Sequence, residues 1–378
     1  MFFANCISYT PIFRNFRKLI SNHMIQKSSA KQRKLLSSVR PSRIIYPILI
    51  GMAAVGYMLY REVSGDTFSE IHLSWNLLWW FLVALIMMAF RDWGYILRLR
   101  ILTGKALSWA KAFRVIMLWE FTSAISPSAI GGTSVAILYV NKEGLRIGHS
   151  SAIVMATSFL DELYFIIMFP LLLIGLDFNQ LFLIETGIDP GFMNTLLYLS
   201  LAGYLVKLLY LIFLSYGLFY NPRGLKWLLL WIFKLPVLRK WKHGANRAGT
   251  DIISNSQALR KKPFLFWFRA FGATFFSWTA RYCVINALLL AFAFCEGFSD
   301  HLLVFARQLV MWIIMLVSPT PGGSGFSEWV FTQFLGDFIP SAGLAVTLAL
   351  IWRLISYYPY LFLGVYLFPR WVNSHFKK

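Results

Sequence analysis

Two proline- and glycine-rich stretches lie inside apolar segments of this sequence. The first spans residues 126–132 and the second spans residues 318–325. Proline removes a backbone donor and glycine weakens a helix, so each stretch predicts a helix break. The residues in these stretches that we expect to shape a binding site are Pro127, Gly131, Gly132, Pro319, Pro321, Gly322, Gly323 and Gly325.

A helix break at membrane depth frees backbone N–H and C=O groups that hydrocarbon cannot satisfy. Such breaks are tolerated where protein or a water-filled cavity surrounds them, and paired breaks in the two halves of a transporter point to its binding site. The alternative is that both stretches are packing kinks in ordinary spanning helices, because proline and glycine are common there.

Charged residues also fall near the middle of apolar segments, where an ionisable group is costly and usually faces a bundle interior or a cavity. They are Glu120, Asp161, Glu162, Lys207, Arg281, Arg307, Glu328 and Arg353. The arginine fork suits phosphate, so Arg281 and Arg353 are the favoured headgroup ligands. The alternative is internal pairing, such as Asp161 with Lys207 at similar depth.

Recognisable enzyme motifs are missing from the sequence. It contains no zinc-protease, Walker, dinucleotide-binding or nucleophile-elbow pattern, and its six histidines and three cysteines are scattered. We therefore expect a protein that is not an enzyme and that has no catalytic residue, metal or cofactor.

The composition indicates a polytopic all-α membrane protein. Apolar residues make up 58% of the chain and charged residues only 14%, so long apolar runs dominate. The formal net charge is +20. Basic loops that face anionic inner-leaflet phospholipid explain this charge better than a nucleic-acid partner, which we do not expect.

The distribution of charge predicts about six full spans and two re-entrant helical hairpins. The predicted spans are residues 44–60, 75–90, 150–176, 195–219, 264–294 and 344–368, and the hairpins lie within 115–140 and 303–335. Residues 91–114 are basic and apolar in turn, and predict a segment in the inner interface. The basic segment 1–43, the loop 221–263 and the tail 369–378 are expected in the cytoplasm, at a bacterial inner membrane.

The first hairpin must return to the side on which it starts, because the basic residues after it would otherwise lie outside. Each half of the transmembrane domain at 44–368 then holds three spans and one hairpin. Since three is odd, repeat two at 195–368 would be inverted relative to repeat one at 44–176.

Several motifs resemble the membrane region of the lysylphosphatidylglycerol synthase/flippase family. They are Arg91-x6-Arg98-x-Arg100, Pro127-x3-Gly131-Gly132, and Pro319-Thr320-Pro321-Gly322-Gly323-x-Gly325-x2-Glu328 followed by Arg353. The resemblance covers about residues 44–368 and implies an inverted-repeat lipid translocase in which the two hairpins meet near the midplane. Members with two domains carry a soluble acyltransferase domain after this region, for which we expect no room before Lys378.

Two functions remain open at this point. The first is a flippase-like transporter that moves a phospholipid, an aminoacyl-phospholipid or a polyprenyl-linked lipid between leaflets. The second is a non-transporting membrane scaffold that docks or regulates a lipid or cell-envelope enzyme. Buried charge in broken helices favours the transporter, since a scaffold does not need it. Membrane lipids, a separate lipid-modifying enzyme and a second copy of the chain are the expected partners.

Overall fold

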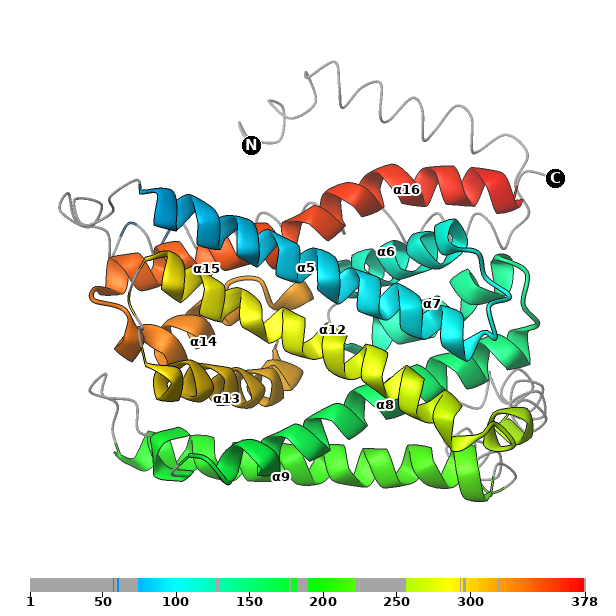
Figure 1. The fold of residues 1–378 in the computed structure, drawn as a ribbon, viewed down its shortest axis with the longest axis horizontal. Helices are drawn as coiled ribbons and strands as arrows, with labels where there is room; N and C mark the ends of the chain where they lie inside the picture. The colour runs from blue at the N-terminus through cyan, green and yellow to red at the C-terminus, as the bar shows by residue number, and fades with distance from the viewer. Residues whose placement is uncertain are drawn as a thin grey trace, which may run out of the picture.

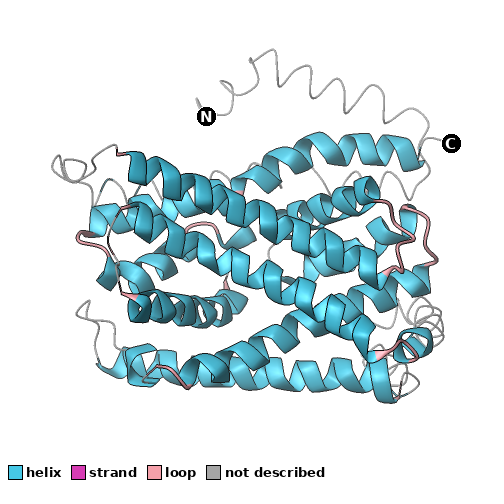
Figure 2. Cartoon of the chain, viewed as in Figure 1, coloured by secondary structure: helices cyan, strands magenta, loops and turns pink. Residues whose placement is uncertain are grey.

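The computed structural model describes residues 57, 60 and 74–376, with gaps at 127–128, 177, 182–189, 222–223, 225–255, 293, 295–296 and 319. Within this part of the chain all regular structure is helical (Figure 2). The described residues leave out segment 1–43, all of the predicted span 44–60 except Tyr57 and Tyr60, most of loop 221–263, Pro127 and Pro319. The α-helices are α5 (Trp75–Leu102), α6 (Trp109–Ile125), α7 (Ala129–Lys142), α8 (Ile147–Leu173), α9 (Pro190–Ser215), α12 (Phe264–Ala291), α13 (Phe298–Ile314), α14 (Phe326–Leu335), α15 (Ala342–Ser356) and α16 (Tyr358–Phe376).

Helices α5 and α12 lie side by side at the centre of the molecule (Figure 1). Their backbones approach closely where a Cβ on Gly94 would stand 2.9 Å from Cβ of Ser277. The Ser277 hydroxyl donates a 2.7 Å hydrogen bond to the Arg91 carbonyl, and Phe90 packs against Phe276. Small residues therefore let these two long helices form the frame on which the other helices pack.

The two short helical pairs lie in opposite halves of the molecule (Figure 1). α6 and α7 occupy the right-hand half, and α13 and α14 occupy the left-hand half. Gly132 of α7 lies directly against Ser123 of α6, so a larger residue there would separate the pair. This arrangement fits two hairpins that enter from opposite sides. Their relation by an inverted repeat stays a prediction, because most of the span 44–60 is not described.

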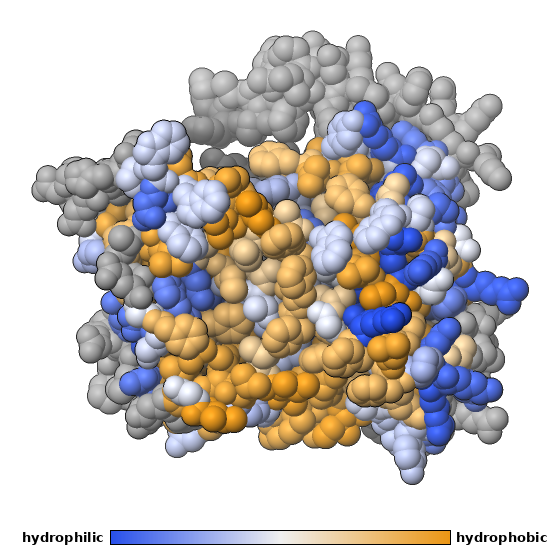
Figure 3. All heavy atoms as spheres, in the orientation of Figure 1, coloured by the Kyte–Doolittle hydropathy of each residue, from blue (hydrophilic) through white to orange (hydrophobic). Residues whose placement is uncertain are grey.

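The surface of the bundle is that of a membrane protein. Four described helical segments are long and apolar enough to cross a membrane, at Trp75–Leu102, Ile147–Leu173, Leu197–Tyr220 and Ala342–His375. Apolar side chains form a broad band across the middle in Figure 3, and hydrophilic ones gather at the right-hand end. Figure 1 puts the α5–α6 and α7–α8 connections at that end. The connections carry Lys105 and Arg146, and Lys111 of α6 and Lys142 of α7 lie next to them.

One predicted boundary was wrong. Residues 91–102 do not form a separate amphipathic segment, because α5 continues through them and buries Arg91 and Arg98. These arginines have carboxylate partners inside the bundle, and the ion pairs offset the free-energy cost of burying the charges. The final predicted span, 344–368, lies within the candidate span Ala342–His375. That segment is interrupted, since α15 ends at Ser356 and α16 starts at Tyr358, with Tyr357 outside helical geometry.

Candidate functional site

The second turn is held in a shape that requires glycine. Gly322, Gly323 and Gly325 have φ angles of 61°, 70° and 81°, in the left-handed region that other residues rarely adopt. Glu328, at the start of α14, is completely buried. Its Oε2 accepts 2.8 Å hydrogen bonds from the Gly325 N–H and from the Ser327 hydroxyl.

Arg353 of α15 closes the same turn from the other side. Its Nε donates to Glu328 Oε1 at 3.1 Å, and its Nη2 donates to the Gly322 carbonyl at 3.0 Å. The guanidinium also lies over the Tyr357 ring, 3.6 Å from the centroid. Arg353 is therefore occupied in holding the turn, as Glu328 is.

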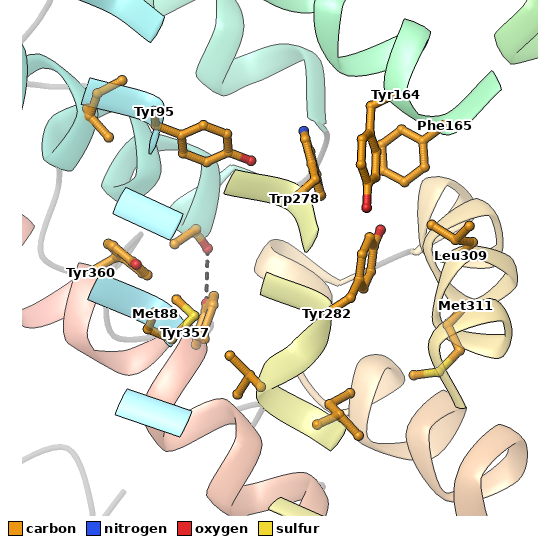
Figure 4. Close-up of a cluster of buried hydrophobic side chains, with 14 of the residues drawn as sticks. Met88, Tyr95, Tyr164, Phe165, Trp278, Tyr282, Leu309, Met311, Tyr357 and Tyr360 are labelled. Carbon is orange, nitrogen blue, oxygen red and sulfur yellow. Dashed lines mark hydrogen bonds between the residues drawn. The ribbon is translucent and has the colours of Figure 1, made fainter. Parts of the chain in front are cut away.

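The two broken segments meet inside the molecule. The Gly322 N–H donates a 3.3 Å hydrogen bond to the carbonyl of Ser126, at the end of α6. The Tyr357 hydroxyl donates to the Ala124 carbonyl at 3.0 Å, which is the contact drawn as a dashed line in Figure 4. The break between α15 and α16 thus supplies a donor to the first turn. Of the other predicted turn residues, Gly131 lies in α7 and Pro321 in the short 3₁₀ turn Pro321–Gly323.

The acidic pair on α8 serves two separate ion pairs. Asp161 accepts from Arg98 at 2.5 Å and from the Trp278 indole at 2.7 Å, while Glu162 pairs with Lys207 at 2.8 Å. The alternative of internal pairing therefore holds for both carboxylates, but Lys207 pairs with Glu162 and not with Asp161, the partner given as an example. Successive helical residues point about 100° apart, so Glu162 faces α9 and Asp161 faces α5 and α12.

Glu120, on the first hairpin, belongs to a third buried group. Arg91 bonds both Glu120 Oε2 and Asp92 Oδ1 at 2.7 Å. The Tyr360 hydroxyl of α16 donates to both Asp92 oxygens, at 2.8 and 3.0 Å. The group ties α5, the first hairpin and the broken last span together.

Arg307, on the second hairpin, pairs with Asp337 at 2.8 Å and donates to the carbonyls of Gln180 and Phe334.

Arg281 differs from the other interior cations. Among the described residues no carboxylate lies within ion-pairing distance of it, whereas Arg91, Arg98, Lys207, Arg307 and Arg353 each have one. The guanidinium lies over two tryptophan rings instead, 5.4 Å from the centroid of Trp278 and 5.3 Å from that of Trp312. Its side chain is only partly buried. Arg281 is thus a cation in a largely apolar surrounding that can still receive an anion.

Aromatic rings line this central region (Figure 4). Tyr95 points its hydroxyl toward Trp278, and Trp278 packs edge-on against Phe165 at 4.8 Å between centroids. Tyr95 itself lies between Arg91 and Arg98, at 4.5 and 4.7 Å. Such rings can stabilise a cation while excluding water. No three His, Cys, Asp or Glu side chains gather to hold a metal ion anywhere in the described part of the chain.

Sequence reasoning missed several residues of this region, among them Arg91, which bonds Glu120 directly. Arg98, Asp92 and Trp278 all contact predicted site residues or their partners. A signal was present, because Arg91 and Arg98 are seven residues apart and so share one face of a helix. We predicted an interfacial helix for this segment because basic residues alternate with apolar ones both in interfacial helices and in helices that bury ion pairs.

The fold and the central site together define an all-α integral membrane protein with broken helices and buried ion pairs. The model of the lysylphosphatidylglycerol synthase transmembrane region matches residues 44–364, and the chain belongs to that family. It is also similar to a UPF0104 membrane protein of Archaeoglobus fulgidus, with 25% identity over 328 residues that cover 82% of this chain and 94% of that protein.

Proposed function

We propose that this chain moves a lipid with a phosphate-containing headgroup between the two leaflets of a membrane, as a flippase-like transporter rather than an enzyme. The lipid would be a phospholipid, an aminoacyl-phospholipid or a polyprenyl-linked lipid, and the membrane would be the cytoplasmic membrane. The observation that carries the proposal is Arg281, a central arginine that has no carboxylate partner among the described residues and faces two tryptophans.

The free-energy cost of an unpaired charge inside a membrane supports this role for Arg281. An unpaired charge near the bilayer centre costs about 2.5–3.5 kcal/mol on insertion scales, so a protein retains it where a partner compensates the cost. The five neighbouring interior cations have partners within the chain, and the partner of Arg281 would come from outside it. A phosphate matches the guanidinium fork in charge and geometry.

The meeting of the two turns supports a path beside this arginine. A headgroup that crosses hydrocarbon must exchange its water for polar groups, since an unpaired phosphate would cost at least several kcal/mol. Broken helices expose backbone N–H groups and helix ends, and here two such segments touch through Gly322 and Ser126. The ion pairs around Glu120 and Asp161 supply fixed polar walls in the same central region.

The test uses the purified chain in liposomes that carry a fluorescent anionic phospholipid, with dithionite added to quench the outer leaflet. Wild-type protein should expose inner-leaflet label to quenching faster than empty liposomes do. Arg281→Gln should slow the exchange at least tenfold, because it removes the charge that compensates phosphate. The matched control is Arg269→Gln, an exposed arginine on the same helix, which should exchange as the wild type does.

Two results would count against the proposal. One is wild-type exchange no faster than in empty liposomes across anionic, zwitterionic and polyprenyl-linked headgroups, which would favour the scaffold function. The other is equal slowing by both arginine variants, which would show that the position of Arg281 has no special role.

A further inference from the structure

A groove on the outside of the bundle lies apart from the central site. It has a volume of about 500 Å³ and lies between α5, α6 and α16. Its lining residues are Ile96, Trp109, Ala110, Phe113, Arg114 and Leu367. A volume of this size falls within the range of about 300–1,000 Å³ that is typical of ligand sites.

The floor of the groove is packed and one of its sides is exposed, because Ile96 is buried in the core and Leu367 packs against that core. Trp109 is 47% exposed and Phe113 is 43% exposed, although both begin a helix whose other face is buried in the core. Tryptophan at the boundary of an apolar band is typical of the level at which lipid headgroups meet acyl chains. Trp109 and Phe113 therefore present an apolar surface to the membrane rather than to the protein core.

One cation, Arg114, lines the groove, and Arg100 and Lys111 lie close to its lining residues or to their partners. The Arg100 guanidinium lies over the Trp109 ring at 4.0 Å, and its Nε donates to the Leu107 carbonyl at 3.2 Å. Lys111 donates to the Glu143 carbonyl at 2.9 Å. Arg114 pairs with the Glu143 carboxylate at 3.0 Å, so that carboxylate balances one of the three cations. Three cations against one carboxylate leave an excess of positive charge beside the groove.

An apolar groove with an excess of positive charge beside it matches one kind of ligand. We infer that this groove binds an anionic phospholipid, with an acyl chain along Phe113 and Leu367 and the phosphate beside Arg100 and Lys111. The site differs from the central one in its residues and in its role, because a lipid would stay here as a bound ligand. The inference does not depend on lipid translocation.

The position of the groove suggests what a bound lipid would do. α6 carries both the groove and, at its far end, the Ser126 carbonyl that contacts the second turn. α16 packs against the same helix, where Gly364 lies directly on Phe121. A lipid that joins α6 to α16 would stabilise the first hairpin in this position. Anionic lipid should therefore raise the thermal stability of the chain.

The inference can be tested by native mass spectrometry of the full chain in detergent, with phosphatidylglycerol or phosphatidylcholine of the same acyl chains as probes. Ala110 is exposed, so Ala110→Trp should fill the groove without disturbing the core. We expect wild type to retain phosphatidylglycerol and Ala110→Trp to bind it at least tenfold more weakly. Leu85→Trp, which adds the same ring at an exposed position of α5 outside the groove, should bind like the wild type.

Charge specificity needs a second variant. Arg100→Gln with Lys111→Gln should remove the preference for phosphatidylglycerol over phosphatidylcholine while leaving residual binding. A photo-crosslinking residue at position 110 should label lipid. Three results would overturn the inference: equal retention by wild type and Ala110→Trp, no preference between the two lipids in the wild type, or crosslinks from position 110 to another protein segment instead of lipid. Since each readout is binding, failure of transport would not produce any of them.

Discussion

Replacing Arg353 with methionine separates a structural role from a direct role in lipid binding. Methionine keeps most of the apolar volume but removes the ion pair to Glu328 and the donor to the Gly322 carbonyl. Gly322 lies in the second turn, and Glu328 lies at the start of α14, directly after that turn, where it is fully buried. The variant would therefore leave a buried carboxylate without its counter-charge.

The expected loss of stability is large. Removal of one partner from a buried ion pair costs about 3–5 kcal/mol, mainly because the remaining charge is uncompensated. Glu328 would keep its bonds from the Gly325 N–H and the Ser327 hydroxyl, which places the expected loss toward the lower end of that range. The free energy of unfolding can be measured in mixed micelles by titration with a denaturing detergent.

A double variant tests the physical reason for this loss. Arg353→Met combined with Glu328→Gln removes the uncompensated charge, and the remaining cost should be about 1–3 kcal/mol from the unsatisfied Gly322 carbonyl. Arg370→Met, at an exposed arginine of α16, is the matched control and should change stability by less than about 0.5 kcal/mol. If Arg353→Met unfolded like the control yet stopped lipid exchange, Arg353 would act on the lipid and our assignment would be refuted.

Two further predictions concern the turn and the topology. Gly322→Ala should lower the free energy of unfolding by more than Gly104→Ala does: both glycines have φ near +60°, which costs alanine about 1–2 kcal/mol, but only the Cβ at 322 would meet Ala124 and Tyr357. Equal losses in unfolding measurements would mean that close approach at the turn is unimportant. In a cysteine-free background, a membrane-impermeant thiol reagent added outside should label Asp300→Cys but not Arg146→Cys, because these positions lie at opposite ends of the bundle. External labelling at 146 would contradict a re-entrant first hairpin.

The sequence was sufficient for the class of fold and for the location of the breaks. Apolar runs of spanning length predict helices directly, since the bilayer leaves few other ways to satisfy backbone hydrogen bonds. The family followed from the motif around Gly322 and Glu328, and the family match confirms it. Glycine in the second turn could also be predicted, because its three glycines at 322, 323 and 325 do have positive φ angles. The assignment of individual site residues to a lipid path stays a prediction.

The partner of each buried charge was decided by tertiary structure. Asp161 and Glu162 are neighbours in the chain, yet one pairs with Arg98 and the other with Lys207, because a helix turns them toward different neighbours. The sequence indicates roughly how deep a residue lies in the membrane. It does not show which neighbouring helix the side chain of that residue faces. For the same reason, the sequence led us to expect the same role, that of a headgroup ligand, for Arg353 and Arg281. Packing distinguishes them. Arg353 pairs with Glu328, whereas Arg281 lies over two tryptophan rings and has no carboxylate partner among the described residues.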